Sequence, residues 1–340
     1  MKEKATSFDI AYQAGVSQST VSRALRNSPL VNEETRLKVQ AIAKELNYKV
    51  DKNASNLRSQ RCDTIALLLF EDPTTDNSAI NPFFISMLGS ITRASAAKGY
   101  DLLVSFQQAS NDWHADFEDS NKADGLILLG YGDYVDFEEK LIKLNEQGTH
   151  FVRWGAEVKD LPIVSIGCDN FLGGKEITEH VIRQGKKHFA FLGSASSHAP
   201  EFFDRYKGHC QALENHKLFI NKNIQFNALY TEEAGYDAAC ELIGSGEKFD
   251  AICAASDLIA IGAIRALKEH NILIPEQVAV VGFDDITIAS FTSPPLTTVK
   301  QDTILAGELL VDTLLESING EDISTTLIPP ELVIRKSCGS

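Results

Sequence analysis

The spacing of hydrophobic residues changes near residue 62 and divides the chain into two parts. Before that point apolar residues recur at helical spacing, and after it short apolar runs alternate with amphipathic stretches. The predicted helices of the second part include 136–147, 171–184 and 257–270, and its predicted strands are 64–70, 100–106, 124–130, 150–154, 162–166, 188–193, 249–255 and 278–283. Such alternation is typical of βαβ units, so we expect two doubly wound parallel-sheet lobes with a ligand site between them.

Three short helices are expected in residues 1–49. Each follows a residue whose side chain can accept a hydrogen bond from the first turn: Thr6 (in a capping box with Asp9), Ser17 and Asn32. Phe8, Ala11 and Tyr12 share helical spacing in the first helix, and Gly15 permits a tight turn after it. A stripe in the third helix predicts its buried face: Val39, Ile42, Ala43 and Leu46. The arrangement fits a helix-turn-helix, although a three-helix bundle without a ligand has the same spacing.

Charge separates the same two parts. The chain of 340 residues has a formal net charge of −15, but residues 1–61 hold eleven Lys and Arg against six Asp and Glu. This basic head of +5 is followed by a body of −20, which favours a phosphate-binding module joined to a body that does not bind DNA. The six cysteines form no C-x-x-C pair, and the chain shows neither a signal peptide nor a membrane span. We therefore expect a cytoplasmic protein that does not bind membranes.

The strings "DIAYQAGVSQSTVSRAL" and "VNEETRLKVQAIAKELNY" resemble the headpiece of the lactose-repressor (LacI/GalR) family. The resemblance implies that Gln18 and Ser19 read base edges in the major groove, and that Arg23 makes bidentate contacts with guanine. It implies phosphate contacts from Ser17, Thr20 and Ser22, and it places Thr6 and Arg26 among the further DNA-binding residues.

Residues 50–61 have weak periodicity and a basic character, which fits a flexible tether. The family resemblance implies instead a hinge helix that forms on DNA, with Leu57 wedged into a minor-groove step, Ala54 as its small neighbour and Arg58 near the backbone. Val50-Asp51 departs from the Pro-Asn of many relatives, and this favours a more disordered isolated linker; Asp51 can still cap the helix.

The body resembles the effector core of the same family, which in turn resembles periplasmic sugar-binding proteins. The motifs are "GCDNFLGG" (167–174), "GKKHFAFLGS" (185–194), "FFDRYKG" (202–208), "SDLIAIGAIRAL" (256–267), "VAVVGFDD" (278–285), "PPLTTVKQD" (294–302) and "ELVIRKS" (331–337). The resemblance implies a headpiece at 1–49, a hinge at 50–61 and a body at 62–340. Within the body it implies lobe one from about 62–162 and 292–324, and lobe two from about 163–291 and 325–340.

The resemblance also implies polar effector contacts. Asp284 takes the family's effector position, while Asp285 is expected to cap a following helix. Arg205 is expected to clamp polar ligand atoms, with a surface salt bridge as the alternative. Glu201 lies one turn before it and suits the vicinal hydroxyls of a sugar. Ser256-Asp257 stands where relatives usually have Asn-Asp, and the shorter Ser256 weakens that contact or leaves room for a larger ligand.

Aromatic walls are expected from Tyr230 and from Phe83 or Phe84, although the two phenylalanines fit a buried core equally well. Trp113 and Trp154 are further candidate stacking faces. The chain lacks phosphate-binding glycine loops, a nucleophile elbow and metal-binding histidine spacing, so we expect no enzyme, catalytic residue, cofactor or metal.

Together these features predict a homodimeric, sequence-specific DNA-binding regulator. We expect a repressor of carbohydrate-utilisation genes that binds a near-palindromic operator and is controlled by a small sugar. The alternatives are a nucleobase-responsive or activator member of the same family, or a sugar-binding transport protein, which would need a signal peptide and would leave the basic head unexplained. The residues leave open whether the effector acts as inducer or corepressor.

Overall fold

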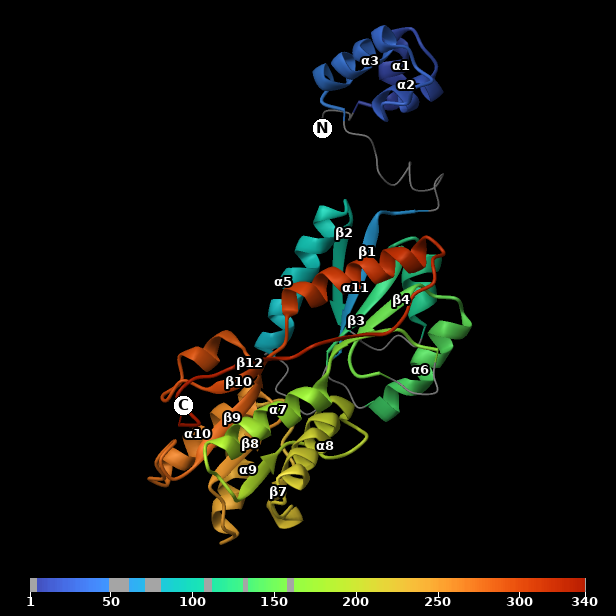
Figure 1. Cartoon of the computed structure of the whole chain (residues 1–340). Coiled ribbons are helices and arrows are strands. Elements are labelled where there is room, and N and C mark those ends of the chain that lie inside the picture. Colours follow the sequence, from blue (N-terminus) through green and yellow to red (C-terminus); the bar gives the residue numbers. More distant parts are fainter. Residues whose placement is uncertain are drawn as a thin grey trace. The chain divides into compact units, whose positions relative to one another are not determined.

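The structure is a computed structural model of the chain, and it describes residues 5–48, 61–70, 81–106, 112–130, 134–157 and 162–339 (Figure 1). Contacts divide the chain into two compact units, Met1–Cys62 and Asp63–Ser340. Among the helices of the described ranges, none is long and apolar enough to cross a lipid bilayer. The expected hinge, with Ala54, Leu57 and Arg58, lies outside the described residues.

The first unit contains the three predicted helices: α1 (Ser7–Ala14), α2 (Gln18–Leu25) and α3 (Glu33–Glu45). Thr6, Ser17 and Asn32 cap them as predicted, and Thr6 forms both bonds of the capping box with Asp9. Gly15 ends α1 at a φ of 69°, a left-handed conformation that glycine adopts without a Cβ clash. Local sequence therefore sets where each helix begins and where the chain turns.

The buried face of α1 differs from the expected one. Phe8 and Tyr12 are 68% and 90% exposed, whereas Ile10, Ala11 and Ala14 are buried. The two alanines leave room for α2 and α3 to approach α1, and the aromatic rings point away from that contact. The predicted stripe of α3 lies in this core: Val39, Ile42, Ala43 and Leu46.

The second unit contains two six-stranded sheets, one in each lobe. The first sheet is parallel, and its spatial order is β11 (Thr326–Ile328), β5 (Ser165–Cys168), β4 (Phe151–Trp154), β3 (Gly125–Leu129), β1 (Thr64–Leu69) and β2 (Asp101–Phe106). On one face it packs against α5 (Pro82–Ala97) and α11 (Thr303–Ile318). On the other face it packs against α6 (Tyr134–Glu146) and the π-helix η1 (Ala115–Asp119).

The second sheet has the order β12 (Glu331–Val333), β10 (Thr297–Lys300), β9 (Ala279–Asp284), β8 (Ala251–Ala254), β6 (Phe189–Leu192) and β7 (Gln225–Phe226). Among the described strands of this sheet, β12 on the edge pairs antiparallel and the others pair parallel. One face packs against α7 (Asn170–Arg183) with its neighbour α8 (Pro200–Asn215), and the other against α10 (Asp257–Glu269) with α9 (Glu232–Gly244). Helices on both faces of a largely parallel sheet confirm the predicted α/β lobes.

The chain crosses between the lobes at other points than we expected. Three crossings follow β5, β10 and β11, at 168–170, 300–303 and 328–331. Consequently β5 belongs to the first lobe, although lobe two was expected from 163, and β10 belongs to the second, although lobe one was expected from 292. β11 likewise pairs with β5 in the first sheet, although lobe two was expected from 325. Each strand completes its pairing before the chain leaves the sheet, because an unpaired buried strand would leave its backbone groups unsatisfied.

Glycines let α7 and α8 approach each other until their backbones touch. A Cβ at Gly174 would clash with the backbone oxygen of Arg205, and a Cβ at Gly208 would clash with that of Phe171. This contact fixes α8, and therefore Arg205, relative to the beginning of α7.

Gly208→Ala is expected to lower the free energy of unfolding by about 1–3 kcal/mol, because the added methyl group forces the two helices apart. Gly244→Ala is the matched control: it lies at the end of α9 with no atom within 4 Å of the new Cβ, so stability should stay within about 1 kcal/mol of the wild type. Urea unfolding of both variants measures the difference. Equal stability of the two would contradict the close packing of α7 and α8.

Candidate DNA and effector interfaces

The second helix of the headpiece presents the predicted base-reading side chains to solvent. Gln18 and Ser19 begin α2, and Arg23 lies one turn after Ser19; all three are exposed. Gln18 Nε2 donates to Ser7 Oγ at 2.8 Å, which holds the amide near the start of α1. Arg23 makes no hydrogen bond or ion pair with the residues that the structure describes. Its side chain is exposed.

The hydroxyl groups expected at phosphates already have partners within the headpiece. Ser17 Oγ accepts from the backbone N–H of Thr20 at 3.1 Å and lies 2.8 Å from both Ser19 Oγ and Thr20 Oγ1. Arg26 folds back onto Ser22, donating to its Oγ at 2.7 Å and to its carbonyl oxygen at 3.2 Å. These hydroxyl groups cap and brace α2, and Ser17 Oγ, with three partners, would have to exchange one of them to bind a phosphate.

A buried ionic cluster lies at the carboxyl ends of the strands of lobe two. Arg205, on α8, is 2% exposed; its Nε donates to Asn170 Oδ1 at 2.8 Å and its Nη1 donates to the carbonyl oxygen of Ala255. Asp284, at the end of β9, is 3% exposed, and its Oδ1 lies 3.6 Å from Arg205 Nη1. Gln301 Nε2 donates to the same oxygen at 2.6 Å. The structure thus brings together Arg205 and Asp284, two of the expected effector contacts, with Asn170 and Gln301.

Aromatic rings flank the guanidinium of this cluster. The Cζ of Arg205 lies 3.8 Å from the ring centroid of Phe283 and 5.2 Å from that of Phe202. A ring face attracts a cation, so both rings stabilise a charge that burial would otherwise penalise. Tyr230, one of the expected ligand-stacking residues, is half-buried and packs against Phe202 with 5.2 Å between ring centroids.

Ser256 and Asp257, two of the expected effector contacts, make hydrogen bonds within the protein interior. Ser256 caps α10 and is fully buried. Asp257 is also fully buried: its Oδ1 accepts from Thr298 Oγ1 and its Oδ2 accepts from the N–H of Ile286 at 2.9 Å. Asp285 does not cap a helix, because its Oδ1 pairs with Arg335 Nη2 at 2.6 Å.

Two buried carboxyl groups, Asp257 and Asp284, lie close enough to affect each other's titration. Burial raises the pKa of Asp257 above its usual range, and the charge of Asp284 raises it further. Burial also raises the pKa of Asp284, against the opposing effects of the Arg205 charge and the Gln301 hydrogen bond. The pair therefore holds protons at pH values where ordinary carboxyl groups have lost them.

Glu201 connects the two lobes. It lies on α8, one turn before Arg205, and its Oε1 accepts from the N–H of Ala156 at 3.0 Å, in the segment after β4 of lobe one. Arg153, 4% exposed at the end of the same strand, donates from Nη2 to the carbonyl oxygen of Ala156 at 2.6 Å. Burial lowers the pKa of Arg153 to about 10, and the negative charge of Glu201 opposes that effect. Our sequence reasoning missed Arg153, although a charged residue inside the apolar run "FVRW" marks it.

Phe83 and Phe84 lie in the core of lobe one, at 1% and 5% exposure. Phe83 packs against Phe84 at 5.3 Å and against Trp154 at 6.0 Å between ring centroids. Of the two expected roles, core residue or ligand wall, this packing supports the core.

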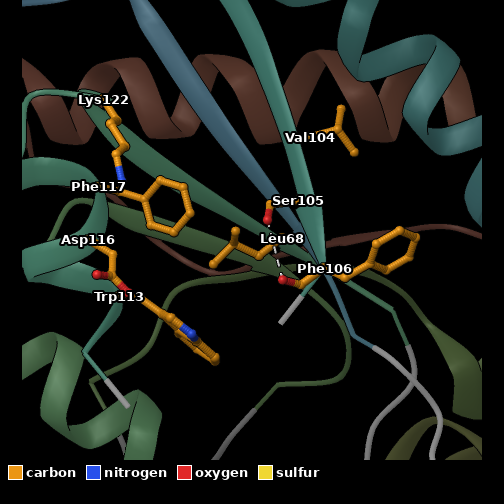
Figure 2. A pocket seen from close by; sticks show the side chains of 8 residues that line it. All are labelled: Leu68, Val104, Ser105, Phe106, Trp113, Asp116, Phe117 and Lys122. Atoms are coloured by element: carbon orange, nitrogen blue, oxygen red, sulfur yellow. Dashed lines mark hydrogen bonds between the residues drawn. The ribbon is translucent and has the colours of Figure 1, made fainter. Parts of the chain in front are cut away.

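A cavity of about 500 Å³ lies in lobe one, between β2 and η1 (Figure 2). Figure 2 shows Trp113, Phe117 and Lys122 on one side and Phe106 and Val104 of β2 on the other. The remaining lining residues are Leu68, Ser105 and Asp116. Trp113, one of the candidate stacking faces, lines this cavity, whereas Arg205, Asp284 and the other expected effector residues do not.

Comparison with known proteins now identifies the chain's relatives. Residues 8–51 match the family described as bacterial regulatory proteins, lacI family, and residues 178–338 match the periplasmic binding protein-like domain. The HTH-type transcriptional regulator RegA of Clostridium saccharobutylicum is 30% identical over 97% of this chain and 98% of its own length. The chain belongs to the LacI family. It is a DNA-binding transcriptional regulator and not an enzyme.

Two solved structures and a further relative are similar to this chain over nearly its whole length. The lac repressor dimer bound to operator and the anti-inducer ONPF is 25% identical, with a TM-score of 0.85 over 99% of both chains. The complex of the transcriptional regulator CelR with cellobiose is 26% identical, with a TM-score of 0.73 over 98% of this chain and 99% of that one. The ribose operon repressor of Escherichia coli strain K12 is 29% identical over 92% of this chain and 93% of its own.

The buried carboxyl pair should contribute less to stability as the pH rises. With raised pKa values in the folded protein, Asp257 and Asp284 hold protons that the unfolded chain releases from about pH 4 upward. Their stabilising contribution is complete below that range and is lost as the pH rises through the folded pKa values. Asp257→Asn should flatten this loss, because the amide can accept from Ile286 and donate to Thr298 without a charge.

Urea unfolding at about pH 5 and about pH 8 tests this expectation. Asp237→Asn, an exposed acid on α9, is the control and should keep the wild-type dependence. An unchanged pH dependence in Asp257→Asn would show that Asp257 is not the titrating group.

Proposed function

We propose that this LacI-family regulator is a homodimer that represses carbohydrate-utilisation genes under the control of a neutral sugar bound between its lobes. The observation that carries the proposal is the buried pair of Arg205 and Asp284 at the carboxyl ends of the lobe-two strands. In doubly wound sheets this edge is where ligands bind. We place the protein in the cytoplasm, associated with the nucleoid when it is bound to DNA.

The charges near this edge favour a neutral ligand. Arg205 faces Asp284, and Arg153 has the opposing charge of Glu201 nearby, so no net charge remains for an ionic ligand to neutralise. A guanidinium donates and a carboxylate accepts, and the hydroxyl groups of a sugar can satisfy both. The ribose operon repressor and the CelR–cellobiose complex among the relatives support the same class of ligand.

In the headpiece, we assign base reading to Gln18, Ser19 and Arg23, which are exposed on α2. A near-palindromic operator would then present one half-site to each protomer. The lac repressor dimer bound to its operator supports this arrangement. Contacts to phosphates are assigned to Ser17, Thr20 and Ser22, further DNA contacts to Thr6 and Arg26, and the hinge contacts to Ala54, Leu57 and Arg58.

Arg23→Ala should weaken operator binding by about 1–3 kcal/mol and relax the preference at one base pair, because a bidentate base contact is lost. Arg36→Ala is the matched control, since Arg36 pairs with Glu33 on α3 at 3.7 Å. Gel-shift titrations on the DNA upstream of the protein's own gene, with single-base variants, measure both effects. An unchanged ranking of the DNA variants would argue against the groove assignment.

A panel of ribose, glucose, cellobiose and hypoxanthine, titrated by calorimetry and in gel shifts, tests the effector class. We expect one of the sugars to bind and to change operator affinity. Asp284→Asn should weaken its binding by about tenfold or more, because a charge-assisted hydrogen bond is lost. Arg265→Met, which removes a surface ion pair with Glu232, should bind like the wild type. A response to hypoxanthine alone would show that the effector is a nucleobase and not a sugar. No response to any sugar would contradict the proposal.

A further inference from the structure

Two buried amide side chains hold the ionic cluster of lobe two. Asn170, 5% exposed, accepts from Arg205 Nε at 2.8 Å and donates from Nδ2 to the carbonyl oxygen of Cys168 at 3.0 Å. Gln301, 3% exposed, donates to Asp284 Oδ1 at 2.6 Å. Each of the two ions is therefore tied to one neutral side chain whose position depends on its own segment of backbone.

Both amides lie where the chain passes from one lobe to the other. Asn170 is the first residue of α7, two positions after β5 of lobe one ends. Gln301 lies between β10 of lobe two and α11 of lobe one. The third crossing is joined to the first, because the N–H of Asp169 donates to the carbonyl oxygen of Ile328 at 3.0 Å. The ions of the cluster thus contact two crossings directly and are connected to the third.

Because these hydrogen bonds are buried, breaking one of them costs free energy. A buried polar group that loses its partner costs free energy, so the amides follow the ions when the ions move. Any change in the hydrogen bonding of Arg205 or Asp284 is consequently passed to the backbone at 168–170 and 300–303. Those segments set how one lobe is oriented against the other, since they are the chain connections between the lobes.

We propose that Asn170 and Gln301 are positioning residues that couple the Arg205–Asp284 cluster to the lobe crossings. The inference deepens the proposed function, on which it rests for the presence of an effector at this cluster. In this role the amides convert a change at the ligand-binding ions into a change of lobe orientation. They differ from the ions themselves in that their substitution disrupts the response more than it disrupts binding.

One hydrogen bond reports on lobe contact without any ligand. The N–H of Ala156 in lobe one donates to Glu201 of lobe two, so its hydrogen exchange speeds up when the lobes separate. Asp284→Asn perturbs the cluster and leaves the shape of the side chain nearly unchanged. We therefore expect Asp284→Asn to speed exchange at Ala156 by at least about threefold, a size typical of coupled neighbours.

The test is a double-substitution cycle on the full chain, read by hydrogen exchange with overlapping peptides that resolve Ala156. In a Gln301→Met background, Asp284→Asn should produce no further increase, because the connection to the crossing is already lost. Asn170→Leu should also abolish the increase, whereas Asn170→Asp, which keeps an oxygen for Arg205 Nε, should retain it. Gln211→Met is the matched control, since Gln211 on α8 bonds only to Asn215 in the described part of the chain.

Additive effects of Gln301→Met and Asp284→Asn would overturn the inference, because the cluster would then reach Ala156 by another route, such as α8. No change at Ala156 in Asp284→Asn would overturn it as well. Unfolding midpoints and operator binding of each variant confirm that the comparison is made on folded protein. The sugar panel described above tests the proposed function separately, since the exchange cycle needs no ligand.

Discussion

The burial of one guanidinium, that of Arg205, is the constraint on which the body of this regulator depends. A cation without water needs a counter-charge, hydrogen-bond acceptors and aromatic faces, and here Asp284, Asn170, the backbone of Ala255 and two phenylalanine rings supply them. These partners come from different strands and helices of lobe two. The order of the sheet and the close approach of α7 and α8 are what bring them to one point.

The two lobes share a chain that passes between them three times, and this limits how they can move. The crossings begin directly after β5, β10 and β11. Each connection between the lobes therefore starts from a strand that is paired within a sheet. The contact of Glu201 with Ala156 adds a polar connection away from the crossings. A change of lobe orientation therefore has to break or rebuild specific hydrogen bonds, which favours discrete arrangements over a continuous range.

Features that depend on neighbours in sequence were predicted well. Helix caps at Thr6, Ser17 and Asn32 require only a residue and the turn after it. A strand was predicted near β5, but the lobe boundaries at β5, β10 and β11 were wrong, because the family resemblance gave only approximate bounds and these strands are three or four residues long. The burial of Asp257 depends on partners that only the tertiary fold brings close, so the sequence alone does not indicate it; Arg153 is marked only by its place inside an apolar run. Family resemblance singled out Arg205 and Asp284, which the structure places together, but not the amides that bond to them.

The crossings also have a consequence for how the protein is made. The first sheet needs β11 at Thr326–Ile328, and the second needs β12 at Glu331–Val333, so neither sheet is complete until synthesis has passed those residues. The headpiece needs nothing beyond its own helices and can fold as soon as it leaves the ribosome. Each nascent chain therefore carries a finished DNA-binding unit for most of its synthesis, before the part that senses the ligand exists.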